Sequence, residues 1–156
     1  MNLDRHATVD PAARLLDPQR KQIVPWENHS VPGLVNAPPG NPWGVKHRGA
    51  TDGNTTALYF DSISNGEQLT GILSSAPFAV PDTLQFWMCG HNGHPGTNPP
   101  AVNHVRLRLV DSGETIAREV PPRHDAAHKY VWDLKRWAGQ QAIFEAVDAD
   151  TGSAYA

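Results

Sequence analysis

The chain has few of the features that bind metal cofactors or place a protein in a membrane. Cysteine occurs once, at Cys89, which excludes an internal disulfide, a C-x-x-C-H haem attachment and any zinc knot built from several cysteines. No apolar run approaches the ~18 residues that cross a bilayer. Residues 1–10 also lack the apolar segment of a secretory signal peptide. If the parent protein is exported, we expect its signal to lie outside this sequence.

Positive charge is scarce as well. Thirteen Lys and Arg stand against sixteen Asp and Glu, which leaves a net charge of −3 with histidine neutral. General binding to a polyanion needs a strong basic patch. We therefore expect no nucleic-acid partner, and the absence of a long apolar run predicts no insertion into a membrane.

Turn-forming residues are abundant by contrast. The 156 residues include 13 Gly and 14 Pro, with no repeat in their spacing, which indicates many turns rather than disorder. The length fits one domain with a single core. The prolines fall too often in residues 1–50 for a long helix, so this part is expected to be irregular. Residues 1–25 are interpreted as a linker or the end of a preceding domain, with one short helix over 11–16, and residues 26–156 as the module itself.

From residue 57 onward the hydrophobic pattern has a period of two. Such alternation is typical of strands with one buried face. The expected strands are Ala57–Phe60, Thr70–Ser74, Thr83–Cys89, Val105–Val110, Thr115–Val120, Lys129–Leu134 and Gln141–Val147.

The clearest of these is Val105–Val110, in which valine and leucine alternate with Arg106 and Arg108. Successive side chains point to opposite faces of a strand, so both arginines are expected to face water. Asp111–Glu114 contains a glycine suited to a tight turn, which predicts a hairpin with the following strand.

About seven short strands without a long helix predict an all-β fold: an antiparallel β-sandwich of jelly-roll or Greek-key type. A helix over 132–141 is disfavoured because Gly139 interrupts it. After the strong strand at 141–147 and a turn at 148–153, Ala154–Ala156 begins a further strand that stops. We expect the module to be truncated before its last strand, with an unpaired edge.

The segment Leu84–Gly93 is the first candidate site, because a strand runs directly into a loop that carries Cys89, His91 and Asn92. Zinc could use Cys89, His91 and His94, with His104 as a fourth ligand, although the spacings C-x-H and H-x-x-H are not those of zinc sites. Cys89 shares a strand face with Gln85 and Trp87, which favours a buried structural cysteine. His91 and Asn92 are then the candidates for ligand contact.

The segment 121–128 is the second candidate, and it is expected to be a loop between two strands. Arg123 and Asp125 could clamp sugar hydroxyls, since together they donate and accept hydrogen bonds. They could equally brace the loop as an ion pair. A hydrolase would instead require His91, Asp125 and His128 to converge in one concave site. A nucleophilic triad built on Cys89 has no local signature.

Two further features complete the candidates. Asp148 and Asp150, with Asp52 or Asp133, could hold a structural calcium ion, although their spacing is not that of an EF-hand and a solvated turn is the default. No other cofactor is expected. Of the five tryptophans, one is expected to form a sugar-stacking platform, at Trp43 or Trp87, and Trp26 and Trp43 to fix the first loop on the sandwich.

These residues form an ordered series that resembles a known family over about residues 41–156. The series is Asn41–Gly44; Gly66–Glu67, Thr70–Gly71 and Leu73–Ser74; Pro81 and Leu84–Phe86; Cys89–Gly93; Pro122–Arg123, Asp125 and Ala127; Trp132–Leu134; and Glu145–Asp148 with Ala154–Ala156. It is similar to a galactose-binding-like β-sandwich module of large exported proteins in planctomycetes and related bacteria. In those proteins the module accompanies c-type cytochrome, DUF1549/DUF1553-like or glycoside-hydrolase-like domains. His94 departs from the family, which has an apolar or aromatic residue there.

The resemblance implies a periplasmic or extracellular location and neighbouring domains of the parent protein as partners. It also implies carbohydrate binding, by analogy of fold alone. We therefore expect a non-catalytic, carbohydrate-binding accessory module, in which His91, Asn92, Arg123 and Asp125 hydrogen-bond a sugar and Trp43 stacks on it. Two alternatives stay open: a docking module without a small ligand, and a hydrolase or metal-binding domain that uses the histidine and aspartate loop residues.

Overall fold

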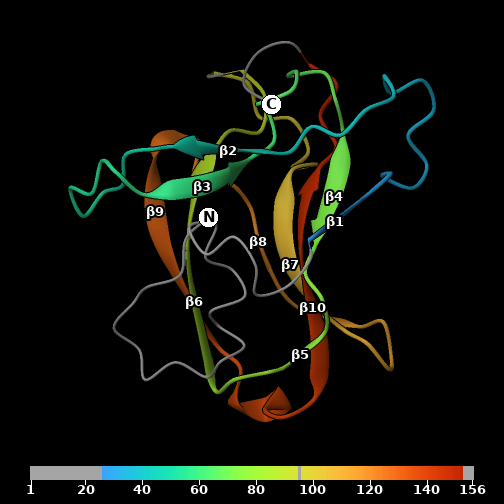
Figure 1. Ribbon diagram of the computed structural model, residues 1–156, viewed down its shortest axis with the longest axis vertical. Coiled ribbons are helices and arrows are strands. Elements are labelled where there is room, and N and C mark those ends of the chain that lie inside the picture. The colour runs from blue at the N-terminus through green and yellow to red at the C-terminus, as the bar shows by residue number, and fades with distance from the viewer. Residues whose placement is uncertain (1–25, 95, 153–156) are drawn as a thin grey trace.

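The computed structural model describes residues 26–94 and 96–152, and these fold into short strands joined by turns. Figure 1 shows their arrangement. The elements are β1 Glu27–His29, β2 Gly44–His47, β3 Leu58–Asp61, β4 Gly71–Ser74, β5 Phe78–Ala79, β6 Thr83–Gly90, β7 His104–Leu109, β8 Thr115–Glu119, β9 His124–Asp133, the 3₁₀ turn η2 Lys135–Trp137, and β10 Gln141–Asp148.

The strands form three antiparallel sheets. The largest has six strands in the order β1-β4-β10-β7-β8, with β5 paired to β10, and the others are the pairs β2–β3 and β6–β9. β6 and β9 run side by side opposite the large sheet, while β2 and β3 lie across the upper half of the molecule (Figure 1). The predicted all-β, antiparallel β-sandwich is confirmed.

The main core fills the space between the large sheet and β6–β9. Alternate residues of each strand enter it, as the period-two pattern requires. Phe86 on β6, Leu107 on β7 and Phe144 on β10 are each 0% exposed. Phe86 stacks on Tyr130 and meets Phe144 edge to face, with ring centroids 5.4 and 5.5 Å away. Such aromatic contacts add to the area that these side chains remove from water.

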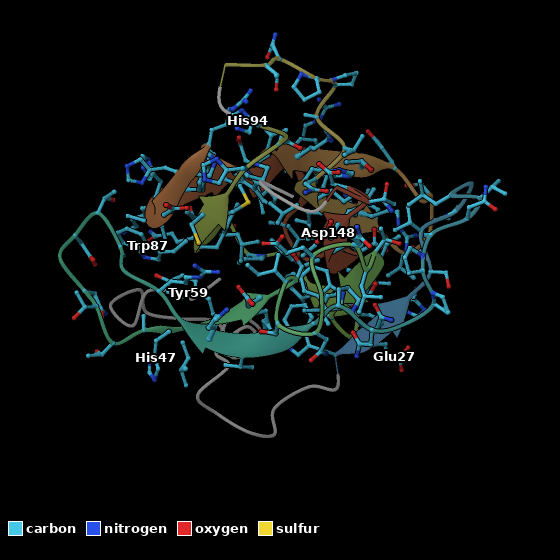
Figure 2. All side chains as sticks on the ribbon, turned by 90° about the horizontal axis from the view of Figure 1, so that it is seen from above. Glu27, His47, Tyr59, Trp87, His94 and Asp148 are labelled. Carbon is cyan, nitrogen blue, oxygen red and sulfur yellow. The ribbon has the colours of Figure 1, made fainter. Side chains whose placement is uncertain are left out.

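A smaller cluster lies on the other face of β6–β9. Ala57 and Tyr59 pack there on Ala127, with Trp87 and Cys89 beside them. The backbone supports this contact, because residues 49–51 run parallel to β9 and exchange hydrogen bonds with Ala127. Seen from above, β2 and β3 close the side between β6–β9 and the outer strands of the large sheet, and Tyr59 lies near Trp87 (Figure 2). The β2–β3 hairpin thus forms a third wall at the upper end.

The described structure differs from the predicted strands in four places, one of which is the short strand β5 Phe78–Ala79. β1 and β2 lie within the part expected to be irregular, and β9 begins at His124, inside the expected loop 121–128. Hydrophobic periodicity does not predict these strands, because β1 and most of β2 are exposed and the start of β9 is polar. The backbone of β9 is nevertheless paired with β6 from its first residue: His124 pairs with Gly90, and His128 pairs with Met88. The expected helix at 11–16 and the strand at 154–156 lie outside the described residues.

The described part of the chain contains no helix with the length and hydropathy needed to cross a bilayer.

Candidate functional site

The inward-facing rows of the sandwich change from apolar to polar at its upper end. On β10 the inward row runs through Ala142, Phe144 and Ala146 and ends at Asp148. On β7 the apolar row continues backward from Val105 to Asn103, just before the strand. A strand must place every second side chain inward, so these polar groups are carried into the interior by the same alternation that builds the core.

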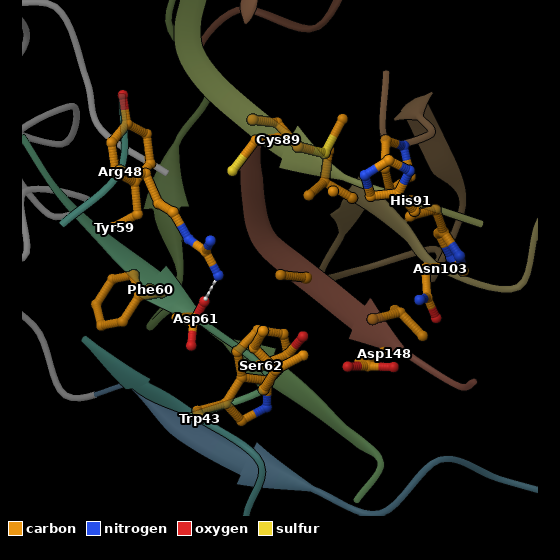
Figure 3. A pocket seen from close by; sticks show the side chains of 18 of the residues that line it. Trp43, Arg48, Tyr59, Phe60, Asp61, Ser62, Cys89, His91, Asn103 and Asp148 are labelled. Carbon is orange, nitrogen blue, oxygen red and sulfur yellow. Dashed lines mark hydrogen bonds and ion pairs between the residues drawn. The ribbon is translucent and has the colours of Figure 1, made fainter. Parts of the chain in front are cut away.

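A cavity of about 400 Å³ lies above this point. Its walls come from the β2–β3 hairpin, the end of β6, the start of β7 and the end of β10. In Figure 3, Arg48, Tyr59 and Asp61 lie on one side, Asn103 and Asp148 on the other, with Cys89 and His91 above. The volume falls in the range of small-molecule sites, which is typically 300–1,000 Å³, and such sites combine apolar walls with a few polar groups.

Asp148 is the most deeply buried acid of the cavity, at 2% exposed. One carboxylate oxygen accepts a hydrogen bond from the Asp150 amide at 3.3 Å, and the nearby Ser62 side chain also favours the charged form of Asp148. The other oxygen, Oδ2, is buried and has no hydrogen-bond partner among the described residues. Burial raises the pKa of Asp148 to about 6, because loss of water disfavours the charged form more than the hydrogen bonds favour it.

Trp43 supplies a buried donor to the same cavity. Its indole Nε1 has no hydrogen-bond partner among the described residues. A loop turn fixes the residue: the Asn41 side chain accepts a hydrogen bond from the Trp43 amide, and the Asn65 amide donates to the Trp43 carbonyl. Trp43 lies beside Ser62 below the cavity in Figure 3. Buried polar atoms normally find partners, so an unused donor and an unused acceptor in one cavity point to a ligand.

Asp61 on β3 is fully engaged within the protein. Arg48 donates to Oδ1 at 2.9 Å and the Ser64 hydroxyl donates to Oδ2 at 2.6 Å. The hydrogen bond to Asp61 raises the pKa of Arg48 against the opposing effect of its burial. This pair is therefore an ion pair that anchors the β2–β3 wall, and both oxygens of the Asp61 carboxylate are occupied.

His91 and Asp125 meet at the rim of the cavity. The His91 Nε2 lies 3.1 Å from Asp125 Oδ1, and the two side chains are 15% and 91% exposed. Both residues line the cavity. His128, the third member of the hydrolase arrangement, does not line the cavity. Its ring is instead 5.2 Å from that of His124.

Asn92 and Arg123 lie behind the cavity wall. The Asn92 side chain accepts a hydrogen bond from the Asn103 amide at 3.0 Å and donates to the Asn103 carbonyl at 3.4 Å. Asn103 in turn accepts from the amides of residues 149 and 150, next to Asp148. Arg123 donates to the carbonyls of Gly93 and His94. These two predicted contact residues position the loops of the site, and Arg123 braces its loop through carbonyls rather than through Asp125.

Cys89 lines the cavity and packs in the smaller core cluster. Burial raises the pKa of its thiol, the opposite of what a nucleophilic thiolate needs. Trp87 packs in the same cluster and is not part of the cavity wall, so of the two expected platforms only Trp43 reaches the cavity. In the described ranges no three histidine, cysteine, aspartate or glutamate side chains gather to hold a metal ion, so neither the zinc set nor the calcium set is assembled there.

Comparison with known proteins shows a distant relation to a curated protein. No family model and no solved structure matches the chain. A curated Aspergillus rugulosus protein named "Putative glycosyl hydrolase ecdE" is 27% identical over 90 residues. That stretch covers 57% of this chain and 12% of the Aspergillus protein.

Proposed function

We propose that the chain is a non-catalytic carbohydrate-binding module and that its ligand occupies the cavity at the upper end of the sandwich. One observation carries the proposal: the cavity holds a buried acceptor, Asp148 Oδ2, and a buried donor, Trp43 Nε1, both without protein partners among the described residues. A hydroxyl group donates and accepts at once, so a molecule rich in hydroxyls meets both needs. Trp43 also offers an aromatic surface for a sugar ring.

The comparison with the Aspergillus protein supports a connection to carbohydrates, since that protein is named as a glycosyl hydrolase. The matched stretch is a small part of its length, which agrees with a module that accompanies other domains. The series of residues between 41 and 156 supports placement in a larger exported protein. In this proposal, any activity of the parent protein resides in the neighbouring domains.

The arrangement of carboxylates favours binding over hydrolysis. Glycoside hydrolysis generally needs one carboxylic acid and a second, free carboxylate across the glycosidic bond. Asp148 has the raised pKa of an acid, but Asp61 is held by Arg48 and Ser64 through both oxygens. Asp125 and Glu67, the other two carboxylates of the lining, are exposed. We therefore expect no release of nitrophenol when the chain is incubated with a panel of nitrophenyl glycosides.

Isothermal titration with a panel of free sugars tests the proposal. Trp43→Phe removes the indole donor, and we expect it to weaken binding about tenfold, the loss that goes with one buried hydrogen bond. Trp137→Phe is the matched control, because Trp137 lies in η2 and outside the cavity wall. Equal affinities in the two variants would show that the sugar binds elsewhere. Absence of binding to every sugar would favour the docking-module alternative.

A further inference from the structure

Three acidic side chains of the described chain are buried, and they differ in what neutralises them. Glu145 is 4% exposed and receives hydrogen bonds from Arg106 and Arg108, while Asp61 is 8% exposed and receives one from Arg48. Asp148, the most buried of the three, has no cation against it among the described residues. The groups that favour its charged form are neutral: the Asp150 amide, which donates a hydrogen bond, and the nearby Ser62 side chain.

Buried charges in proteins are paired, because an unpaired one loses its hydration without compensation. Arg48 cannot serve Asp148, since its guanidinium is engaged with Asp61 on the opposite wall (Figure 3). A cationic partner for ionised Asp148 would therefore come from outside the described chain. Asp148 lines the cavity, so a small displacement of the atoms that cover Oδ2 would bring such a partner into contact with it.

The charge of the whole lining selects the sign of that partner. The lining contains four carboxylates, against the single guanidinium of Arg48; the four are Asp61, Glu67, Asp125 and Asp148. Among the imidazoles, burial lowers the pKa of His104, which keeps it neutral near pH 7. An anionic ligand would face uncompensated carboxylates, whereas a cation finds in Asp148 a carboxylate that is already desolvated and has no cationic partner among the described residues.

We propose that the ligand of this cavity carries an ammonium group that binds the free oxygen of Asp148, so that the preferred ligands are amino sugars with an unmodified amine. This inference rests on the proposed function, since the hydroxyl groups of the same sugar serve Trp43 and the rim. An ammonium–carboxylate hydrogen bond is charge-assisted and roughly twice as strong as a neutral one. N-acetylation removes the charge and adds bulk, so an N-acetyl sugar is expected to lose this advantage.

The test compares three matched series by titration calorimetry: glucosamine, galactosamine and mannosamine, each with its parent hexose and its N-acetyl derivative. The buffer is phosphate, because Tris carries an amine and hydroxyls and would compete. At about pH 7.5, above the pKa of Asp148, we expect at least one amine to bind about tenfold more tightly than both of its relatives, the ratio that separates charge-assisted from neutral hydrogen bonds. Asp148→Asn should reduce that ratio to about one, and it keeps the size of the side chain.

Asp133→Asn is the charge-matched control. Asp133 lies at the other end of the β6–β9 pair, exposed and outside the cavity lining, and the variant should keep the full preference for the amine. Preference that survives Asp148→Asn would overturn the role of Asp148.

The remaining outcomes separate the inference from the proposed function. Hexoses that bind as tightly as their amines would overturn the inference and leave carbohydrate binding intact. Absence of binding by all nine sugars would overturn both. Calcium chloride titrated without sugar is the last arm: binding that Asp148→Asn abolishes would assign the site to a metal ion instead of an ammonium group.

Discussion

The burial of Asp148 predicts that the substitution Asp148→Asn stabilises the folded protein at neutral pH. The pKa of this carboxyl is raised from 3.8 to about 6 by loss of water. At about 1.4 kcal/mol for each pH unit between the two values, ionised Asp148 costs the fold about 3 kcal/mol. Asparagine has nearly the same shape and carries no charge. About 1 kcal/mol is subtracted because the hydrogen bond from the Asp150 amide becomes weaker, which leaves a gain of about 2 kcal/mol.

The sign of the pH dependence follows from the direction of the shift. Because the folded protein binds this proton more tightly than the unfolded chain, unfolding releases it between about pH 3.8 and 6. The stability of the native protein therefore falls as pH rises through this window, and the loss is complete above about pH 6. The Asp148→Asn variant lacks this titration. Its advantage should be near zero at about pH 4 and full at about pH 7.5.

Other titratable groups face the same cavity, and the comparison must remove their contributions. Asp150 in the same turn adds to the raised pKa of Asp148 by repulsion. The remaining ionisable neighbours come from several elements; they are Arg48, Tyr59, Asp61, Glu67, Cys89, His91, His104 and Asp125. Because both proteins contain all of them, the difference between variant and native stability at each pH isolates Asp148 to the extent that these groups act independently.

Urea unfolding followed by tryptophan fluorescence measures this difference at the two pH values. A gain of about 2 kcal/mol corresponds to a rise of roughly 4–8 °C in Tm for a chain of this size, which offers a second readout. Asp133→Asn serves as the control, since its side chain is 71% exposed and should change stability by less than about 0.5 kcal/mol. A variant that is less stable than the native protein at neutral pH, or a gain that does not vary with pH, would refute the reasoning.

Three further substitutions probe the walls and the core, each read by urea unfolding. Burial opposes ionisation of Glu145, but hydrogen bonds from the two arginines of β7 outweigh it and lower its pKa, so Glu145→Gln should cost about 2 kcal/mol at neutral pH. That cost should shrink as pH falls below about 4.5, and a constant cost would contradict the ion-pair account. Arg48→Met leaves Asp61 buried and unpaired and should cost about 3 kcal/mol; an unchanged protein would show that this pair does not anchor β2–β3. Phe86→Ala opens a hole among aromatic rings in the main core and should cost about 3–5 kcal/mol, and a loss below about 1 kcal/mol would place Phe86 outside a packed core.

The fold is predictable from the sequence wherever one strand face is buried against the core. Val105–Val110 is expected as a strand and β7 spans His104–Leu109, with both arginines on the outer face and joined to Glu145. Alternation fails for β1 and β2, whose residues are nearly all exposed and whose backbones pair with β4 and β3. No side-chain pattern in the sequence predicts a strand of that kind.

The sequence predicts the candidate site less well than the fold, because it points to loop residues as the ligand contacts. His91, Asp125 and Trp43 reach the cavity, whereas Asn92 and Arg123 stabilise the loops behind it. Asn92 could not be separated from His91 by sequence, since both follow the same strand. Only the long-range contact between Asn92 and Asn103 assigns the one to support and the other to the rim.

The position of Asp148 in the sequence contains a signal that points to the cavity. Because Asp148 and Asp150 stand close in sequence, the sequence favours a solvated turn there, with a structural calcium ion as the alternative. The strand that precedes them contains a stronger constraint: Ala142, Phe144 and Ala146 face inward, and the next inward position is Asp148. A carboxylate at the end of an apolar inward row can stay buried only if the fold or a ligand provides it with partners. The last inward-facing residue of a strand therefore indicates a cavity of this kind more directly than the composition of the loops does.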